Sequence, residues 1–286
     1  MGLRIQNNVE AFNAHRQLTG TAAKAAKAME KLSSGYRINR AADDAAGLAI
    51  SEKMRSQIGG LAQAQRNAQD GVSLVQTAEG ALTEVQSMLQ RVRDLKVQYS
   101  NGTLDSEDKE AIASEVKQLA VEIDKIRDDT EFNGIKLLDG SGGTSGTVSF
   151  QVGANTGETV SVTTVDITAS ATSAGQSALQ TVATAATDAA ASTAFAGVTL
   201  DNIDNAIESV SSLRASFGAV QNRLEHRLNN LATYQENLVA SESRIRDVDM
   251  AAEMVNFTKL SILQQAGTSM LAQANQAPQS VLSLLQ

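Results

Sequence analysis

Apolar residues recur at every seventh position between residues 203 and 245, and this repeat constrains the fold more than any other feature of the sequence. A second series lies three positions further along and is interrupted mainly at Arg227 and Ser241. Together the two series form an apolar stripe along one side of a long helix, and another helix has to cover that stripe. We expect this helix to begin with Asp201 as its N-cap. The first series consists of Ile203, Val210, Phe217, Leu224, Leu231, Leu238 and Ile245.

The N-terminal half of the sequence supplies a matching stripe. Apolar residues spaced by three, four or seven positions predict a helix over residues 44–99, and similar spacing predicts another over residues 106–129. Neither long helix is able to bury its stripe alone, so we expect the helices to lie side by side. The positions assigned to this contact on the first long helix include Leu61, Val75 and Leu82.

Residues 139–199 break the helical pattern. Glycines end the helix, and valines alternate on both sides of a turn at residues 153–157, which predicts a β-hairpin. Residues 166–199 are rich in Ala, Ser and Thr, and we expect a short exposed segment with one helical stretch over residues 177–191. The predicted fold is therefore mainly α: a long antiparallel helical coiled-coil bundle with a small β-hairpin region.

Composition excludes several classes of protein. Only 3% of the 286 residues are aromatic, which favours a thin helical body over a thick rounded core. The net charge of −8 argues against a general nucleic-acid-binding protein, and the lack of cysteine excludes disulfides and thiol catalysis. The sequence contains no run of about 18 apolar residues and no segment of secretory type, so we expect no membrane insertion and no export by the general route.

The sequence offers no catalytic or metal-binding set. It lacks the zinc-protease, dinucleotide-binding, P-loop and nucleophile-elbow motifs. We interpret the two histidines, His15 and His226, as surface or inter-subunit residues. The acidic pair at residues 43–44 is interpreted as the start of a helix, where the helix dipole favours acids. We therefore predict a protein that is not an enzyme and that uses no metal or other cofactor.

The two ends of the chain carry opposite charge and only lightly apolar helical stripes. Residues 1–40 hold seven Lys/Arg and two Asp/Glu, a balance of +5, whereas residues 247–286 hold one and three, a balance of −2. We expect these terminal arms to pair with each other and with the arms of other copies. Residues 41–165 and 200–246 would form the helical rod domain with the hairpin, and residues 166–199 a variable surface segment. If the arms of successive copies join head to tail, the contacts do not close on themselves, and such open-ended contacts generate helical filaments.

Several long motifs, in order along the chain, resemble those of bacterial flagellin. They begin with LSSGYRINRAADDAAGLAISEKMRSQ at residues 32–57. The resemblance covers residues 1–165 and 200–286, and the sequence is similar to a short flagellin that lacks large outer domains. The remaining motifs are RNAQDGVSLVQTAEGAL, TEFNGIKLLDG, FQVGANTGETV, GAVQNRLEHRLNNL, SRIRDVDMAAEM and the closing SVLSLLQ.

The resemblance implies a structural subunit that self-assembles into the helical flagellar filament used for swimming. It implies export through the flagellar type III apparatus, a secreted extracellular location, and a partnership with an export chaperone, the filament cap and hook-filament junction proteins. In the family the arms are disordered in the monomer and form an inner coiled coil in the filament. A hook-filament junction protein is the alternative, although the FQVGANTGETV stretch favours flagellin.

The resemblance also implies contacts with host sensors of flagellin. Arg91, Leu95 and Glu115 match the positions of a family patch that a Toll-like receptor recognises. The other charged residues at 91–96, including Lys96, are interpreted as a solvated helix face. The C-terminal residues that match an assembly segment, also read by cytosolic sensors, are Val281, Leu282, Leu284 and Leu285.

Overall fold

The computed structural model describes residues 8–167 and 174–284, and its contacts divide the chain into two compact units. The first unit contains residues 1–58 and 236–286, and the second contains residues 59–235. The expected terminal arms, residues 1–40 and 247–286, both fall within the first unit. The boundaries between the units lie inside the two longest helices.

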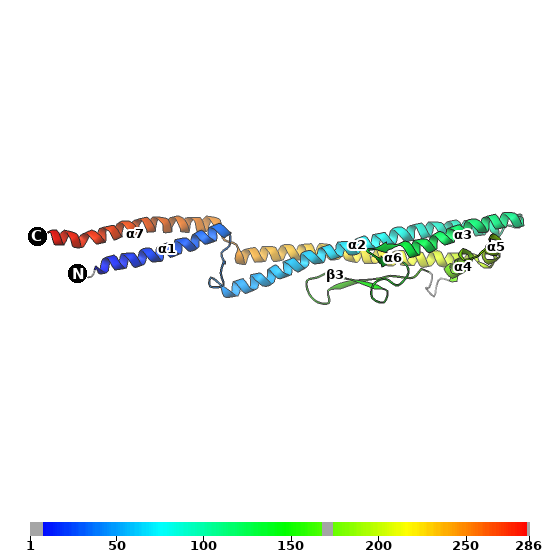
Figure 1. Ribbon diagram of the computed structural model, residues 1–286, viewed down its shortest axis with the longest axis horizontal. Helices are drawn as coiled ribbons and strands as arrows, with labels where there is room; N and C mark the ends of the chain where they lie inside the picture. Colours follow the sequence, from blue (N-terminus) through cyan, green and yellow to red (C-terminus); the bar gives the residue numbers. More distant parts are fainter. Residues whose placement is uncertain (1–7, 168–173, 285–286) are drawn as a thin grey trace. The chain divides into compact units, whose positions relative to one another are not determined.

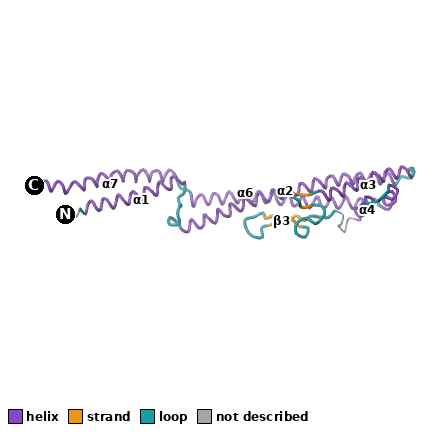
Figure 2. Tube along the Cα trace, viewed as in Figure 1, coloured by secondary structure: helices purple, strands orange, loops and turns teal. Residues whose placement is uncertain are grey.

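Helices account for most of the described residues, as Figures 1 and 2 show. The mainly α fold with long helices and a small hairpin is confirmed. The long helix predicted over residues 44–99 is α2, and the one predicted over residues 106–129 is α3. The helices are α1 (Val9–Ser34), α2 (Ala45–Tyr99), α3 (Ser106–Asp129), α4 (Ala174–Ala183), α5 (Asp188–Gly197), α6 (Leu200–Arg246) and α7 (Met250–Leu284).

The start of α6 differs from the prediction that Asp201 is its N-cap. The Thr199 Oγ1 accepts a hydrogen bond from the Asn202 backbone N–H at 3.2 Å, so Thr199 caps the helix. Asp201 lies inside the first turn, where its negative charge interacts favourably with the positive end of the helix dipole. An acid two positions after a threonine is thus a signal of the first turn rather than of the cap.

Two hairpins interrupt the helices. The predicted hairpin is formed by β3 (Thr147–Gln151) and β4 (Thr159–Thr163), which pair antiparallel with Ser149 opposite Ser161. A smaller one, formed by β1 (Glu131–Phe132) and β2 (Ile135–Lys136), was not predicted. Its turn is Asn133-Gly134, with φ angles of 51° and 77°, and an Asn-Gly pair is the sequence signal for such a turn.

The core of the second unit lies where α2, α3 and α6 contact one another. Apolar residues of all three helices are fully covered there, and the β3–β4 hairpin adds Val160 and Val162. Gly71 of α2 permits a close approach, since a Cβ at this position would lie 3.2 Å from Leu224 Cδ1 and 3.4 Å from the Phe150 ring. Even an alanine at this position would require its neighbours to shift.

Residues 174–199 correct the expectation of an exposed segment with one helix. They form two helices, α4 and α5, because Thr187 caps the second by accepting a hydrogen bond from the Ala190 N–H. Both helices contact α3, and their few large apolar residues face inward. Phe195 is fully buried, and so is Val182. A low apolar content did not mean exposure here, because the apolar residues are concentrated on the covered side.

Candidate functional site

The first unit holds α1 and α7 together with very little apolar contact. Ala25 and Ala28 of α1 meet Leu260 of α7, and Phe257 packs beside them. At the far end of the pair, Asn8 Nδ2 donates to the Ala274 carbonyl at 2.7 Å. The two helices therefore run antiparallel, with a core of small side chains that contributes little stability on its own.

Large apolar side chains remain exposed on these same two helices. Phe12 of α1 and Val255 of α7 each keep 71% of their surface exposed, and Ile262 keeps 60%. Apolar surface of this extent on helices with a minimal core is typical of a protein-protein contact. The exposed large apolar residues of this surface are Val9, Phe12, Met29, Met250, Met254, Val255, Ile262, Leu263 and Met270.

Backbone hydrogen bonds join the two connecting segments of the first unit. Gly35 ends α1 in the left-handed conformation, with φ 76°. The Val248 N–H donates to the Gly35 carbonyl at 3.0 Å, and the Arg37 N–H donates to the Arg246 carbonyl at 2.7 Å. The chain after α1 is thus paired like a short strand with the chain between α6 and α7, although the two are about two hundred residues apart.

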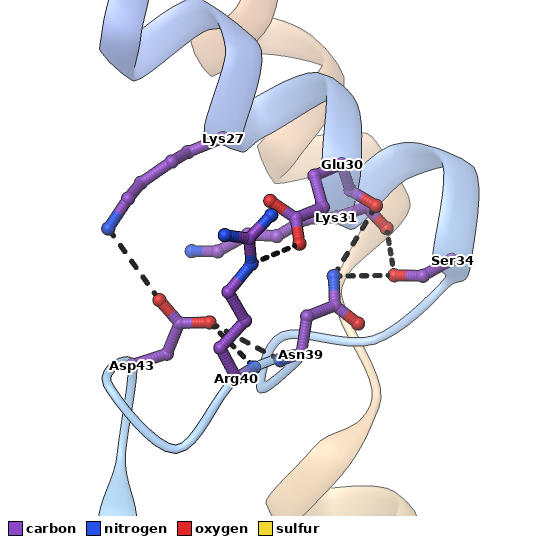
Figure 3. Close-up of polar contacts among 7 residues, drawn as sticks. All are labelled: Lys27, Glu30, Lys31, Ser34, Asn39, Arg40 and Asp43. Atoms are coloured by element: carbon purple, nitrogen blue, oxygen red, sulfur yellow. Dashed lines mark hydrogen bonds and ion pairs between the residues drawn. The ribbon is translucent and has the colours of Figure 1, made fainter.

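Charged side chains fold the segment after α1 back onto that helix (Figure 3). Lys27 Nζ lies 3.7 Å from Asp43 Oδ1, and Arg40 Nε donates to Glu30 Oε1 at 2.9 Å. Asp43 Oδ2 also accepts hydrogen bonds from the backbone N–H groups of Arg40 and Asn39. The Arg40 backbone N–H is the main cause that lowers the pKa of Asp43 below its ordinary value. Asp43 thus holds the segment after α1 in place through these contacts.

The start of α2 is fixed by a close contact with Ile38. Asp44 Oδ1 accepts a hydrogen bond from the Gly47 N–H at 2.8 Å, as expected at a helix start. Ile38 is buried, and a Cβ at Gly47 would lie 2.8 Å from its Cδ1. Any larger residue at position 47 would displace Ile38 or the capping carboxylate.

Arg246 links α6 to the start of α2 within the first unit. Its Nη1 donates to Glu52 Oε1 at 2.7 Å, and its guanidinium lies 4.8 Å from the centroid of the Tyr36 ring. The hydrogen bond from Arg246 is the main cause that lowers the pKa of Glu52. The side chain of Arg246 is largely buried, which makes this ion pair better defined than an ordinary surface pair.

The predicted helix-packing positions lie along the contact faces of α2 and α6. In the second unit, the α6 residues of the sevenfold repeat are buried, as are the three positions named on α2. Leu238 and Ile245, which belong to the first unit, are only half-buried. The residues of the sevenfold repeat in α6 are thus buried to different extents in the two units. The buried members are Ile203, Val210, Phe217, Leu224, Leu231, Leu61, Val75 and Leu82.

The three residues of the receptor-like patch differ in accessibility. Arg91 of α2 and Glu115 of α3 form an ion pair with a distance of 2.8 Å, and both side chains are exposed. Leu95 is only 2% exposed and belongs to the core between these helices. A partner that approaches this face therefore meets the ion pair and not the leucine.

Lys96 was assigned to a solvated helix face, and the structure shows that this is wrong. Its side chain is buried under α5, where Nζ donates to the Phe195 carbonyl at 2.8 Å and lies 4.8 Å from the Phe195 ring centroid. Burial lowers the pKa of Lys96. The ammonium satisfies a carbonyl at the C-terminal end of α5. The available signal was its spacing, four residues after Val92 and three before Tyr99, both on the apolar stripe.

The remaining candidates provide no chemical site. His15 and His226 are exposed and lie in different units. Val281, Leu282 and Leu284 are in α7 but their side chains lie outside the described part, and Leu285 lies outside the described residues altogether. Over residues 8–167 and 174–284, no three His, Asp or Glu side chains are grouped so that they could hold a metal. Among the helices of these ranges, none has the length and apolar character to cross a membrane.

Two family models match the chain. The model described as the bacterial flagellin N-terminal helical region matches residues 5–142. The model described as the bacterial flagellin C-terminal helical region matches residues 200–285. Together they include α1, α2 and α3 on one side and α6 and α7 on the other.

Curated relatives match over nearly the whole length. Flagellin of Halalkalibacterium halodurans is 55% identical over 283 residues, which cover 98% of this chain and 99% of the relative. Flagellin of Bacillus subtilis is 52% identical over 303 residues, which cover 99% of this chain and 100% of the relative. Among solved structures, Bacillus cereus flagellin is 34% identical with a TM-score of 0.47, covering 58% of this chain and 88% of that one.

Proposed function

The chain belongs to the bacterial flagellin family, and we propose that α1 and α7 are the segments through which it joins other copies in the flagellar filament. Membership makes the protein a structural filament subunit, since this family is one of structural proteins rather than enzymes. The full-length relatives are named flagellins, and nothing favours the hook-filament junction protein.

The observation that carries the proposal is the exposed apolar surface of α1 and α7. Among the side chains of α1 and α7 that the structure describes, the pair buries two alanines and a leucine. This burial does little to offset the conformational entropy of ordering some sixty residues. Further burial has to come from outside the molecule, and neighbouring copies present the same surface. Each exposed apolar side chain covered in this way would stabilise the assembly by about 1.5–3 kcal/mol before the cost of association.

Seeded filament growth tests this proposal. Val255→Asn and Ile262→Asn, combined in one chain, should raise the concentration needed for growth by about tenfold or more, because each adds a polar group to the buried contact. Val97→Asn is the matched control, since Val97 is 51% exposed on α2 in the second unit. Sedimentation of filaments gives the concentration of free subunit. Normal growth of the double variant, or of a chain that lacks residues 247–286, would contradict the proposal.

Export and location are part of the same proposal. The family resemblance supports passage through the flagellar type III apparatus with the help of an export chaperone, growth beneath the filament cap, and a first contact with junction proteins. The small core of the first unit supports it as well, because such helices unfold at low cost. Antibody labelling of intact cells would locate the protein, and labelling inside the cell alone would contradict an extracellular filament.

Recognition by host sensors is proposed for the exposed ion pair and for the C-terminal leucines. Arg91 and Glu115 would contact a flagellin-sensing Toll-like receptor, with Leu95 supporting them from the core. Arg91→Ala should weaken binding of the receptor ectodomain to the monomer. Unchanged binding would remove Arg91 from the contact.

A further inference from the structure

Methionine is the side chain of this protein that mild oxidants modify most readily. The sequence contains no cysteine and no tryptophan, but it contains seven methionines. The thioether sulfur of methionine takes up an oxygen atom and becomes a sulfoxide, which turns a flexible apolar side chain into a polar one. The position of each methionine in the fold therefore decides what oxidation does to the protein.

The methionines are distributed unevenly among the helices. Met54 and Met88 lie on α2, where both are half-buried, and Met88 packs against the core of the second unit. Met1 lies outside the described residues. The other four lie on the two helices of the proposed assembly surface, and each keeps between 48% and 59% of its surface exposed. These arm methionines are Met29 of α1 and Met250, Met254 and Met270 of α7.

The contact between α1 and α7 places three of the arm methionines at one end of the helix pair. Met29 directly follows Ala28, which meets Leu260 of α7. Because the helices run antiparallel, the residues of α7 that precede Leu260 lie beside the residues of α1 that follow Ala28. Met250 and Met254 both precede Leu260, and their spacing of four residues places them on one face of α7. Oxidation would therefore add several polar groups to one end of the pair.

The proposed assembly surface depends on apolar side chains that neighbouring copies cover. Methionine suits such a surface, because its flexible and polarisable side chain adapts to an irregular partner. A sulfoxide oxygen is a hydrogen-bond acceptor, and covering it without a donor opposes the contact. We propose that the arm methionines are an oxidation site of the free subunit, at which sulfoxide formation blocks assembly and reduction of the sulfoxides restores it. This site rests on the proposed function, because it requires the surface of α1 and α7 to be covered in the filament.

Hydrogen peroxide supplies the oxygen atom. The sulfur lone pair attacks one peroxide oxygen, so that an S–O bond forms, the O–O bond breaks, and the departing hydroxide takes the proton of the transferred oxygen and becomes water. The sulfur is oxidised by two electrons, and the peroxide is reduced by two electrons. Methionine sulfoxide reductases reverse the change with two electrons from a dithiol, which becomes a disulfide, and the sulfoxide oxygen leaves as water. Each reductase accepts one sulfoxide epimer, so complete reversal needs both.

Peroxide treatment of the full chain tests the proposal. Free subunits are oxidised, and peptide mass spectrometry gives the sulfoxide fraction at each methionine. The arm methionines should oxidise faster than Met54 and Met88, because they are more exposed. The oxidised subunit should need about a tenfold higher concentration for seeded growth, and treatment with both reductases should restore the original value. Normal growth after complete oxidation of the arm methionines, or a loss of growth that the reductases do not reverse, would overturn the proposal.

Substitution by leucine separates the arm methionines from other targets of peroxide. The arm variant keeps apolar side chains of similar volume that do not form sulfoxides. Its own growth before oxidation is the reference, and peroxide should leave that value unchanged. The substitutions in the arm variant are Met29→Leu, Met250→Leu, Met254→Leu and Met270→Leu.

The matched control carries Met54→Leu and Met88→Leu. It keeps the arm methionines, so peroxide should raise the concentration that it needs for seeded growth by the same factor as in the original chain. Circular dichroism checks that both variants keep their helices before and after oxidation. A peroxide-induced loss of growth that is as large in the arm variant as in the control would place the damage elsewhere and overturn the proposal.

The outcomes separate this site from the role of α1 and α7. Normal growth of the oxidised subunit, with growth still impaired by Val255→Asn and Ile262→Asn, removes the oxidation site and leaves the proposed function standing. Normal growth of the Val255 and Ile262 variant contradicts the proposed function, whatever peroxide does to the original chain. Assembly should also protect the arm methionines, so peroxide should oxidise them more slowly in filaments than in free subunits. Equal rates in the two states would overturn the proposal.

Discussion

The helix pair α2 and α6 in the second unit and the helix pair α1 and α7 in the first unit differ in how completely they are covered. In the second unit, α3, α4, α5 and the β3–β4 hairpin add to the contact, and residues such as Leu82, Val210 and Leu224 are fully buried. In the first unit, the helices meet through Ala25, Ala28 and Leu260. An amphipathic helix gains stability when other elements cover its apolar side. The apolar sides of α2 and α6 in the second unit are covered within the molecule, whereas large apolar side chains of α1 and α7 stay exposed.

The largest effect is expected when a carboxylate is introduced into each helix pair in turn. Phe217→Asp should lower the free energy of unfolding of the second unit by about 4 kcal/mol or more, because a buried ring is replaced by a group that needs water. Phe12→Asp should lower the free energy of unfolding of the first unit by less than about 0.5 kcal/mol, since Phe12 is exposed on α1. Urea unfolding followed by circular dichroism measures both. Equal effects would show that the two units do not differ as described.

A smaller test removes Leu260, the buried large residue in the described part of the α1–α7 core. Leu260→Ala should cost about 2 kcal/mol, at the low end for such a change because its neighbours are mostly alanines. The loss should be confined to the first unit. Hydrogen exchange would then accelerate at amides of α1 and α7 while those around Val75 and Val210 stay protected. Faster exchange throughout α2 would show that the second unit depends on the first.

The smallest effect is expected from acid acting on the Arg246–Glu52 contact. Because Arg246 lowers the pKa of Glu52 in the folded state, the contact stabilises the protein above the ordinary value of 4.5. This stabilisation is lost as the pH falls through the lower, folded pKa. Glu52→Gln should abolish this part of the pH dependence, which melting curves between neutral and acidic pH would reveal. A melting temperature that falls equally in both proteins would assign the acid sensitivity to other carboxyls.

Most of the helical fold could be predicted from the sequence, because helix periodicity is a local property. The limits of α2 and α3 followed from apolar spacing, and the β3–β4 hairpin followed from alternating valines around a glycine turn. The expectation of a single exposed helix over residues 177–191 was wrong, because composition does not reveal that Val182 and Phe195 fall on one covered side. The β1–β2 hairpin was missed although its Asn133-Gly134 turn was visible.

The candidate site was predictable in kind but not in detail. Lightly apolar stripes at both ends of the chain predicted surfaces that other copies would cover, and Met29, Met254 and Met270 of these stripes are exposed. Phe12 and Val255, which are more exposed still, lie outside the predicted stripes. The spacing of Lys96 placed it on the apolar stripe, but the sequence did not show that α5 would cover it, or that the Val152 carbonyl would lie beside Arg227. Each of these joins residues from elements that are separate in the sequence, and no local pattern encodes which elements will meet.

The sequence by itself determined where the long helices run and which side of each is apolar, since a repeat of seven residues leaves a helix few alternatives. Tertiary structure decided how far each stripe is covered. The same sevenfold repeat contains Leu224, which is fully buried, and Leu238, which is half-buried, because the hairpin packs against α6 only at the first of them. Burial depends on the neighbours that the folded chain brings together, and those neighbours come from distant parts of the sequence.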